Sequence, residues 1–171
     1  MVRLALKTFL HPASIALMDL IILIPVVLSI GVVVATIGHD KLEEPMDILE
    51  GIGVVLIGWG VAIEERPSLR VIFGLTAAAD PAFEAGIDAL CHSSGIGLLI
   101  LGLFSEIAVT AVRLPNNIVP TEGFDHWVLY VSTAFIAFGA FVLAQHIVRL
   151  VIAMIWGRVP APHQPAPGEV S

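Results

Sequence analysis

Residues 15–38 read IALMDLIILIPVVLSIGVVVATIG, and Asp19 is the one charged residue among these 24. A membrane-spanning helix needs about 20 mostly apolar residues, because each residue adds about 1.5 Å and the hydrocarbon core is about 30 Å thick. The apolar region of a secretory signal is shorter, at about 7–15 residues. The stretch therefore predicts a retained membrane-spanning helix, which we place at 13–37.

The composition of the whole chain also indicates a membrane protein. Of its 171 residues, 57% are hydrophobic and 13% are charged, and the mean hydropathy is +0.96. Soluble domains usually carry about 25% charged residues, so lipid is expected to cover the excess apolar surface. Further spans are predicted at 46–65, 86–112 and 127–156. The fold class expected is all-α, an integral membrane four-helix bundle of residues 1–157, followed by a proline-rich tail at 158–171.

The basic residues predict the orientation in the membrane. Cytoplasmic loops carry an excess of Lys and Arg. With four spans, six basic residues fall on one side and two on the other; the six are Arg3, Lys7, Arg66, Arg70, Arg149 and Arg158, and the two are Lys41 and Arg113. We therefore expect both termini in the cytoplasm, and a bacterial cytoplasmic (inner) membrane as the location. The connector at 68–84 is either an amphipathic surface segment or an ordinary loop.

Several classes of function are disfavoured. The net charge of −7 leaves no basic face for nucleic acid. Cys91 is the single cysteine, so neither an intrachain disulfide nor a cysteine-based zinc site is expected. The chain has no nucleophile-elbow or zinc-protease motif, so no catalytic residues are assigned.

Two of the predicted helices carry the same pattern of residues. Spacings of 3, 4, 3 and 4 place five positions on one helix face. In the second span these are Glu50, Gly53, Ile57, Gly60 and Glu64, and in the third they are His92, Gly95, Leu99, Gly102 and Glu106. Glycines allow helix backbones to approach closely in lipid. We therefore predict helix packing through Gly53, Gly60, Gly95 and Gly102.

If these two faces meet in antiparallel helices, the ionisable residues form two clusters. Glu50 would approach Glu106 at the outer end. Glu64 and His92 would meet at the inner end, where Asp19 and His146 are also expected. An ionised carboxylate in hydrocarbon costs at least about 2.5–3.5 kcal/mol, so such groups are expected to pair, to hold a proton or a cation, or to line water.

Three functions from different classes follow from these features. The first is a non-catalytic subunit of a larger membrane complex, with other subunits or copies of itself and the lipid bilayer as partners. The second is a proton or cation pathway along the carboxylates and histidines of the two clusters. The third is a haem or quinone electron-transfer anchor, in which His92 and His146 are the candidate haem ligands; no other metal site is predicted.

Overall fold

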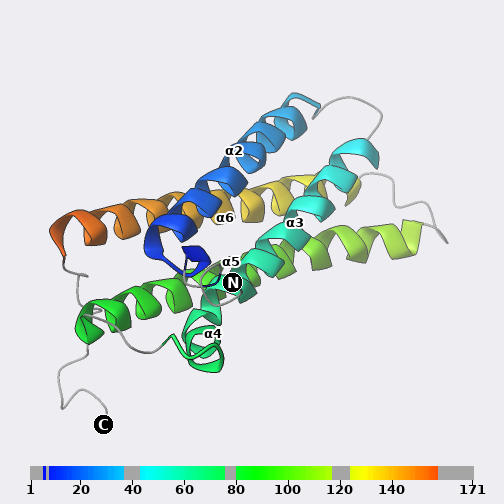
Figure 1. The fold of residues 1–171 in the computed structure, drawn as a ribbon. Helices are drawn as coiled ribbons and strands as arrows, with labels where there is room; N and C mark the ends of the chain where they lie inside the picture. Colours follow the sequence, from blue (N-terminus) through cyan, green and yellow to red (C-terminus); the bar gives the residue numbers. More distant parts are fainter. Residues whose placement is uncertain (1–5, 7, 37–42, 76–79, 117–123, 158–171) are drawn as a thin grey trace, which may run out of the picture.

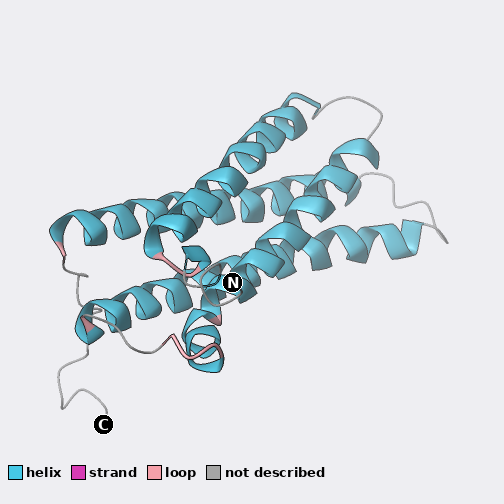
Figure 2. Ribbon diagram, viewed as in Figure 1, coloured by secondary structure: helices cyan, strands magenta, loops and turns pink. Residues whose placement is uncertain are grey.

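The computed structural model describes residues 6, 8–36, 43–75, 80–116 and 124–157, so the predicted tail at 158–171 and residue 37 lie outside it. The described chain is all-helical (Figures 1 and 2). The helices are α2 (Pro12–Thr36), α3 (Glu43–Glu64), α4 (Arg66–Ile72), α5 (Pro81–Asn116) and α6 (Phe124–Trp156).

Four of these helices are long and apolar enough to cross a membrane. The qualifying segments are Pro12–Thr36, Pro45–Glu64, Pro81–Ala111 and Trp127–Trp156. They correspond to the four spans expected from the sequence, and they confirm the all-helical class. Trp127 and Trp156 lie at opposite ends of α6 and are 71% and 75% exposed, as interfacial aromatic residues are.

The third long helix begins at Pro81, ahead of the membrane span expected at 86–112. Asp80 Oδ1 accepts hydrogen bonds from the amides of Ala82 and Phe83, at 3.0 Å each. A carboxylate before the first turn satisfies amides that have no partner within the helix, and proline is favoured at the first helical position. Glu84 therefore lies in the first turn of α5, where it is part of a charged cluster described below.

The connector at 68–84 is partly helical rather than an ordinary loop. Pro67 lies in the first turn of α4, and Gly74 ends that helix with a φ of 65°. The amide of Gly74 bonds the Val71 carbonyl at 3.1 Å, and the amide of Leu75 bonds the Arg70 carbonyl at 2.8 Å. These two bonds form a Schellman motif, for which glycine is the preferred residue. The chain therefore turns sharply between α3 and α5.

Contacts between single side chains fix how the long helices pack. Leu56 of α3 lies over Gly139 of α6, where an added Cβ would come within 2.7 Å of its Cδ1. Phe104 of α5 stacks on Phe135 of α6, with ring centroids 5.6 Å apart. In Figure 1, α5 begins near the end of α6 and ends near its beginning, so the two helices are antiparallel. The buried side chains come from all four long helices.

Candidate functional site

The glycine faces of α3 and α5 lie against each other. A Cβ at Gly60 would lie 2.7 Å from the Gly95 carbonyl oxygen, and a Cβ at Gly102 would lie 2.7 Å from the Gly53 carbonyl oxygen. Real Cβ atoms do not approach oxygen so closely, so only glycine permits this separation of the two backbones. The pairing runs from Gly53 with Gly102 to Gly60 with Gly95, which makes α3 and α5 antiparallel.

Glu106 faces α3 at one end of this contact. A Cβ built on Gly53 would lie 3.3 Å from Glu106 Oε2. Glu50 lies one turn before Gly53 on α3, so the carboxylate of Glu106 is directed to the part of α3 that carries Glu50. Both side chains are partly buried and both take part in polar interactions.

Glu64 and His92 meet at the other end of the contact. His92 Nδ1 lies 3.0 Å from Glu64 Oε1. The two side chains differ in exposure: Glu64 is 25% exposed, whereas His92 is 55% exposed. The pair therefore lies at the surface of the α3–α5 contact, and the imidazole faces outward.

Asp19 and His146 form a second carboxylate–histidine pair, which is completely buried. His146 Nδ1 of α6 lies 2.8 Å from Asp19 Oδ2 of α2, and both side chains have 0% exposure. The two atoms are within hydrogen-bonding distance, but the angles are not those of a hydrogen bond, and the contact is an ion pair only when the imidazole is protonated. Trp59 of α3 donates a hydrogen bond of 2.6 Å from Nε1 to Asp19 Oδ1.

These three residues, which we call the buried triad, join α2, α3 and α6. Because Trp59 holds one carboxylate oxygen and His146 lies against the other, Asp19 is fixed from two sides. His146 Nε2 is buried and has no hydrogen-bond partner within the part of the chain that the structure describes. An imidazole nitrogen of this kind can accept a proton or a hydrogen bond.

The two histidines proposed as haem ligands belong to different pairs. His146 lies in the interior with Asp19, and His92 lies at the surface with Glu64. Across the described residues, no group of three or more His, Cys, Asp or Glu side chains could hold a metal ion. The geometry therefore gives no support to joint ligation by His92 and His146.

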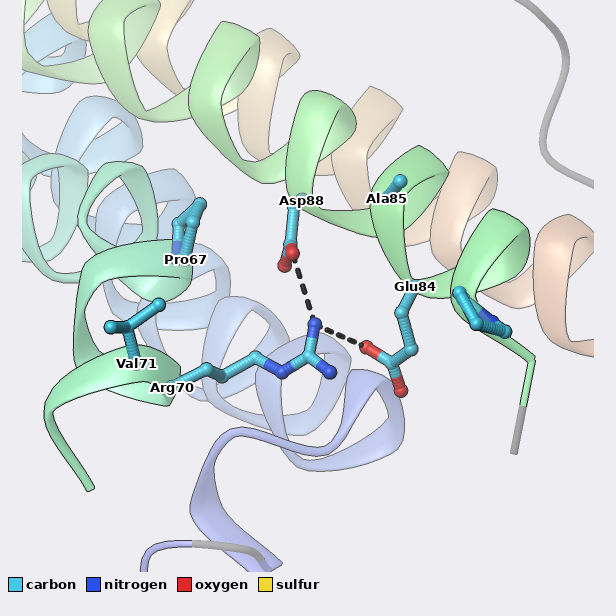
Figure 3. A pocket seen from close by; sticks show the side chains of 7 residues that line it. Pro67, Arg70, Val71, Glu84, Ala85 and Asp88 are labelled. Carbon is cyan, nitrogen blue, oxygen red and sulfur yellow. Dashed lines mark hydrogen bonds and ion pairs between the residues drawn. The ribbon is translucent and has the colours of Figure 1, made fainter. Parts of the chain in front are cut away.

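A cluster of two arginines and two carboxylates joins α4 to the first turns of α5. Arg66 bonds Glu84 at 2.9 Å and also bonds Asp88. Arg70 Nη1 lies 2.9 Å from Asp88 Oδ2 and 3.0 Å from Glu84 Oε2. Figure 3 shows the Arg70 side chain between these two carboxylates. We call these four residues the arginine–carboxylate cluster. Arg66 is only 1% exposed, and its Nε also donates to the Leu10 carbonyl at 3.0 Å.

A pocket of about 220 Å³ lies beside this cluster and is open on one side. Arg70, Glu84 and Asp88 line it together with apolar side chains that include Pro67 and Val71 (Figure 3). The polar groups at its wall are already bonded to each other, so the pocket offers a ligand mainly apolar contact.

The sequence interpretation did not assign a role to Trp59 or to the arginine–carboxylate cluster. One signal for Trp59 was available, because tryptophan inside a span, rather than at an interface, needs a partner for its N–H. The cluster also had a signal: Arg66 and Arg70 are four residues apart, and so are Glu84 and Asp88. Two such pairs of opposite charge can face each other from two helices.

Comparisons with known proteins add no assignment: no protein-family model, no curated protein and no solved structure matches this chain.

Proposed function

We propose that the chain is a non-catalytic subunit of a larger integral membrane complex, assembled with other membrane subunits or with copies of itself. In this proposal both termini lie in the cytoplasm, and the membrane is the bacterial cytoplasmic membrane. The observation that carries the proposal is the outward-facing pair of His92 and Glu64. It lies within two helices that can cross a membrane, and the imidazole is 55% exposed.

A polar side chain on a lipid-facing surface is costly, and such residues usually face protein or water instead. A neighbouring helix would cover His92 and offer it a second partner. The glycine faces, by contrast, do not support assembly between chains, because Gly53, Gly60, Gly95 and Gly102 are already used between α3 and α5 within one chain. We therefore place the contact between subunits at the His92 surface and not at the glycines.

The test is the size of the particle purified gently from its own membrane. We expect the wild-type protein to run as a complex in native gels and native mass spectrometry. His92→Ala should dissociate that complex, whereas Ser93→Ala should not, because Ser93 is exposed on the same helix but does not belong to the pair. Helical circular dichroism confirms that each variant folds. A monomeric wild type would refute the proposal. A complex that His92→Ala leaves intact would show that assembly does not depend on the pair of His92 and Glu64.

The second candidate function is a proton or cation pathway, and the buried pair of Asp19 and His146 favours it. Ionisable residues in the membrane interior commonly mark ion pathways. Flux into liposomes is the measurement, with Glu106→Gln and Asp19→Asn as the variants. A flux that neither substitution changes would exclude this pathway.

A further inference from the structure

The buried triad places an ionisable pair within the membrane-spanning part of the molecule. Asp19 lies seven residues after the start of α2, and Trp59 lies five residues before the end of α3. His146 lies ten residues before the end of α6. At 1.5 Å per residue these separations are roughly 10, 8 and 15 Å. The triad is therefore nearer to the end of the molecule at which α2 begins.

Each oxygen of Asp19 already has a contact, whereas one nitrogen of His146 does not. Trp59 Nε1 donates to Oδ1, and His146 Nδ1 lies against Oδ2. The remaining polar atom of the triad is His146 Nε2, which is buried without a hydrogen-bond partner among the described residues. Buried polar groups are usually paired, so an atom of this kind points to something that it binds.

We propose that His146 Nε2 is the proton acceptor of an internal proton-binding site, which Asp19 neutralises and Trp59 holds in place. A neutral imidazole beside the Asp19 carboxylate gives the pair a net charge of −1. When Nε2 takes up one proton, the imidazolium and the carboxylate form a pair with no net charge. No other bond forms or breaks, and the proton comes from water on the side at which α2 begins.

Among the described residues, the neighbours of His146 and Asp19 come from α2, α3 and α5. Asp19 is the facing carboxylate from α2, and Trp59 is the polar residue from α3. From α5, Cys91 lies within electrostatic range of Asp19, and also of Arg66, Asp88 and Glu84.

This inference depends on neither function proposed above, because a protein that conducts no current and forms no complex can still bind a proton. Trp59 offers a direct optical probe, since its indole donates to the carboxylate whose partner changes charge. The chain has three tryptophans. Trp127 and Trp156 are more than two-thirds exposed, so both can be replaced with Phe, and Trp59 is then the single tryptophan that remains.

The experiment is a pH titration of Trp59 emission in lipid nanodiscs, with circular dichroism at each pH. We expect a reversible change with the steepness of one proton. It should disappear in His146→Gln and in Asp19→Asn, and it should persist in His11→Gln, the control that removes an exposed histidine outside the triad. Asn keeps the volume of Asp19 and an oxygen for Trp59, so Asp19→Asn tests the proposal even if His146→Gln fails to fold.

Three results would overturn the proposal. If the emission of the folded protein does not change between mildly acidic and mildly basic pH, the pair is a permanent structural ion pair. If the change persists in a folded His146→Gln variant, another group is responsible for it, and if it persists in Asp19→Asn, the carboxylate does not neutralise the site.

Discussion

Arg66 and Arg70 lie one helical turn apart and bind the same two carboxylates, yet they differ in burial. The Arg66 side chain is 2% exposed and the Arg70 side chain is 13% exposed. Arg66 also donates to the Leu10 carbonyl, so it joins three segments of the chain. Removing one partner from a buried ion pair costs about 3–5 kcal/mol, because the remaining charge stays buried without compensation.

In Arg66→Gln the carboxylates of Glu84 and Asp88 still pair with Arg70. We therefore expect Arg66→Gln to lower the free energy of unfolding by less than that range, and Arg70→Gln to lower it by less still. The measurement is reversible unfolding by denaturing detergent, followed by circular dichroism. If the two variants lose the same stability, the burial of Arg66 and its bond to Leu10 do not contribute as described.

The buried triad shows which contacts of single residues could be predicted from the sequence. Asp19 and His146 were expected near the same end of the molecule because helix rise gives depth. Their direct contact could not be derived, since depth does not specify which faces of α2 and α6 meet. Trp59 was missed for the same reason: its partner lies forty residues away on another helix.

For the element pair α3 and α5, glycine positions on the two faces of α3 provide a matched comparison. Gly60 lies against the α5 backbone, where a Cβ would come within 2.7 Å of the Gly95 oxygen, whereas a Cβ at Gly58 would meet nothing within 4 Å. Overpacking a tight contact costs about 1–3 kcal/mol, while alanine is the better helix former in open space.

Gly60→Ala should therefore destabilise the protein by about 1–3 kcal/mol, and Gly58→Ala should leave it unchanged or slightly more stable. Thermal unfolding in one detergent compares the two directly. Equal effects of the two substitutions would mean that the close approach of the backbones does not limit the side chain at position 60.

The elements differ in how well their sequences specified them. The 3–4 spacing of the glycines determined which face of α3 meets α5, because a helix repeats nearly every 3.6 residues. The expected span at 86–112 followed hydropathy and therefore left out the polar first turn of α5, which begins where Asp80 precedes Pro81. The short helix α4 lacked enough residues for periodicity to distinguish it from a loop.

At the scale of the whole molecule, four spans require both termini and the α3–α5 connection to lie on one side of the membrane. The contact of Asp19 with His146 is consistent with this, because it joins the first part of α2 to the last part of α6. The contacts between helices are the same in both orientations, so packing does not determine which side faces the cytoplasm. That side was inferred from the six basic residues on one side against two on the other.

Cysteine labelling in intact bacterial cells tests this arrangement. Cys91 is fully buried, so Cys91→Ala gives a background in which single cysteines are placed at Ser68, at Ser171 and at Thr121. A reagent that does not cross membranes should label the cysteine of Thr121→Cys in intact cells. It should label those of Ser68→Cys and Ser171→Cys only after the membrane is permeabilised, because the proposed orientation places both positions in the cytoplasm. If Ser68→Cys and Ser171→Cys are both labelled from outside, the four spans stand and the orientation is reversed. If they are labelled from opposite sides, one of the four helices does not cross the membrane.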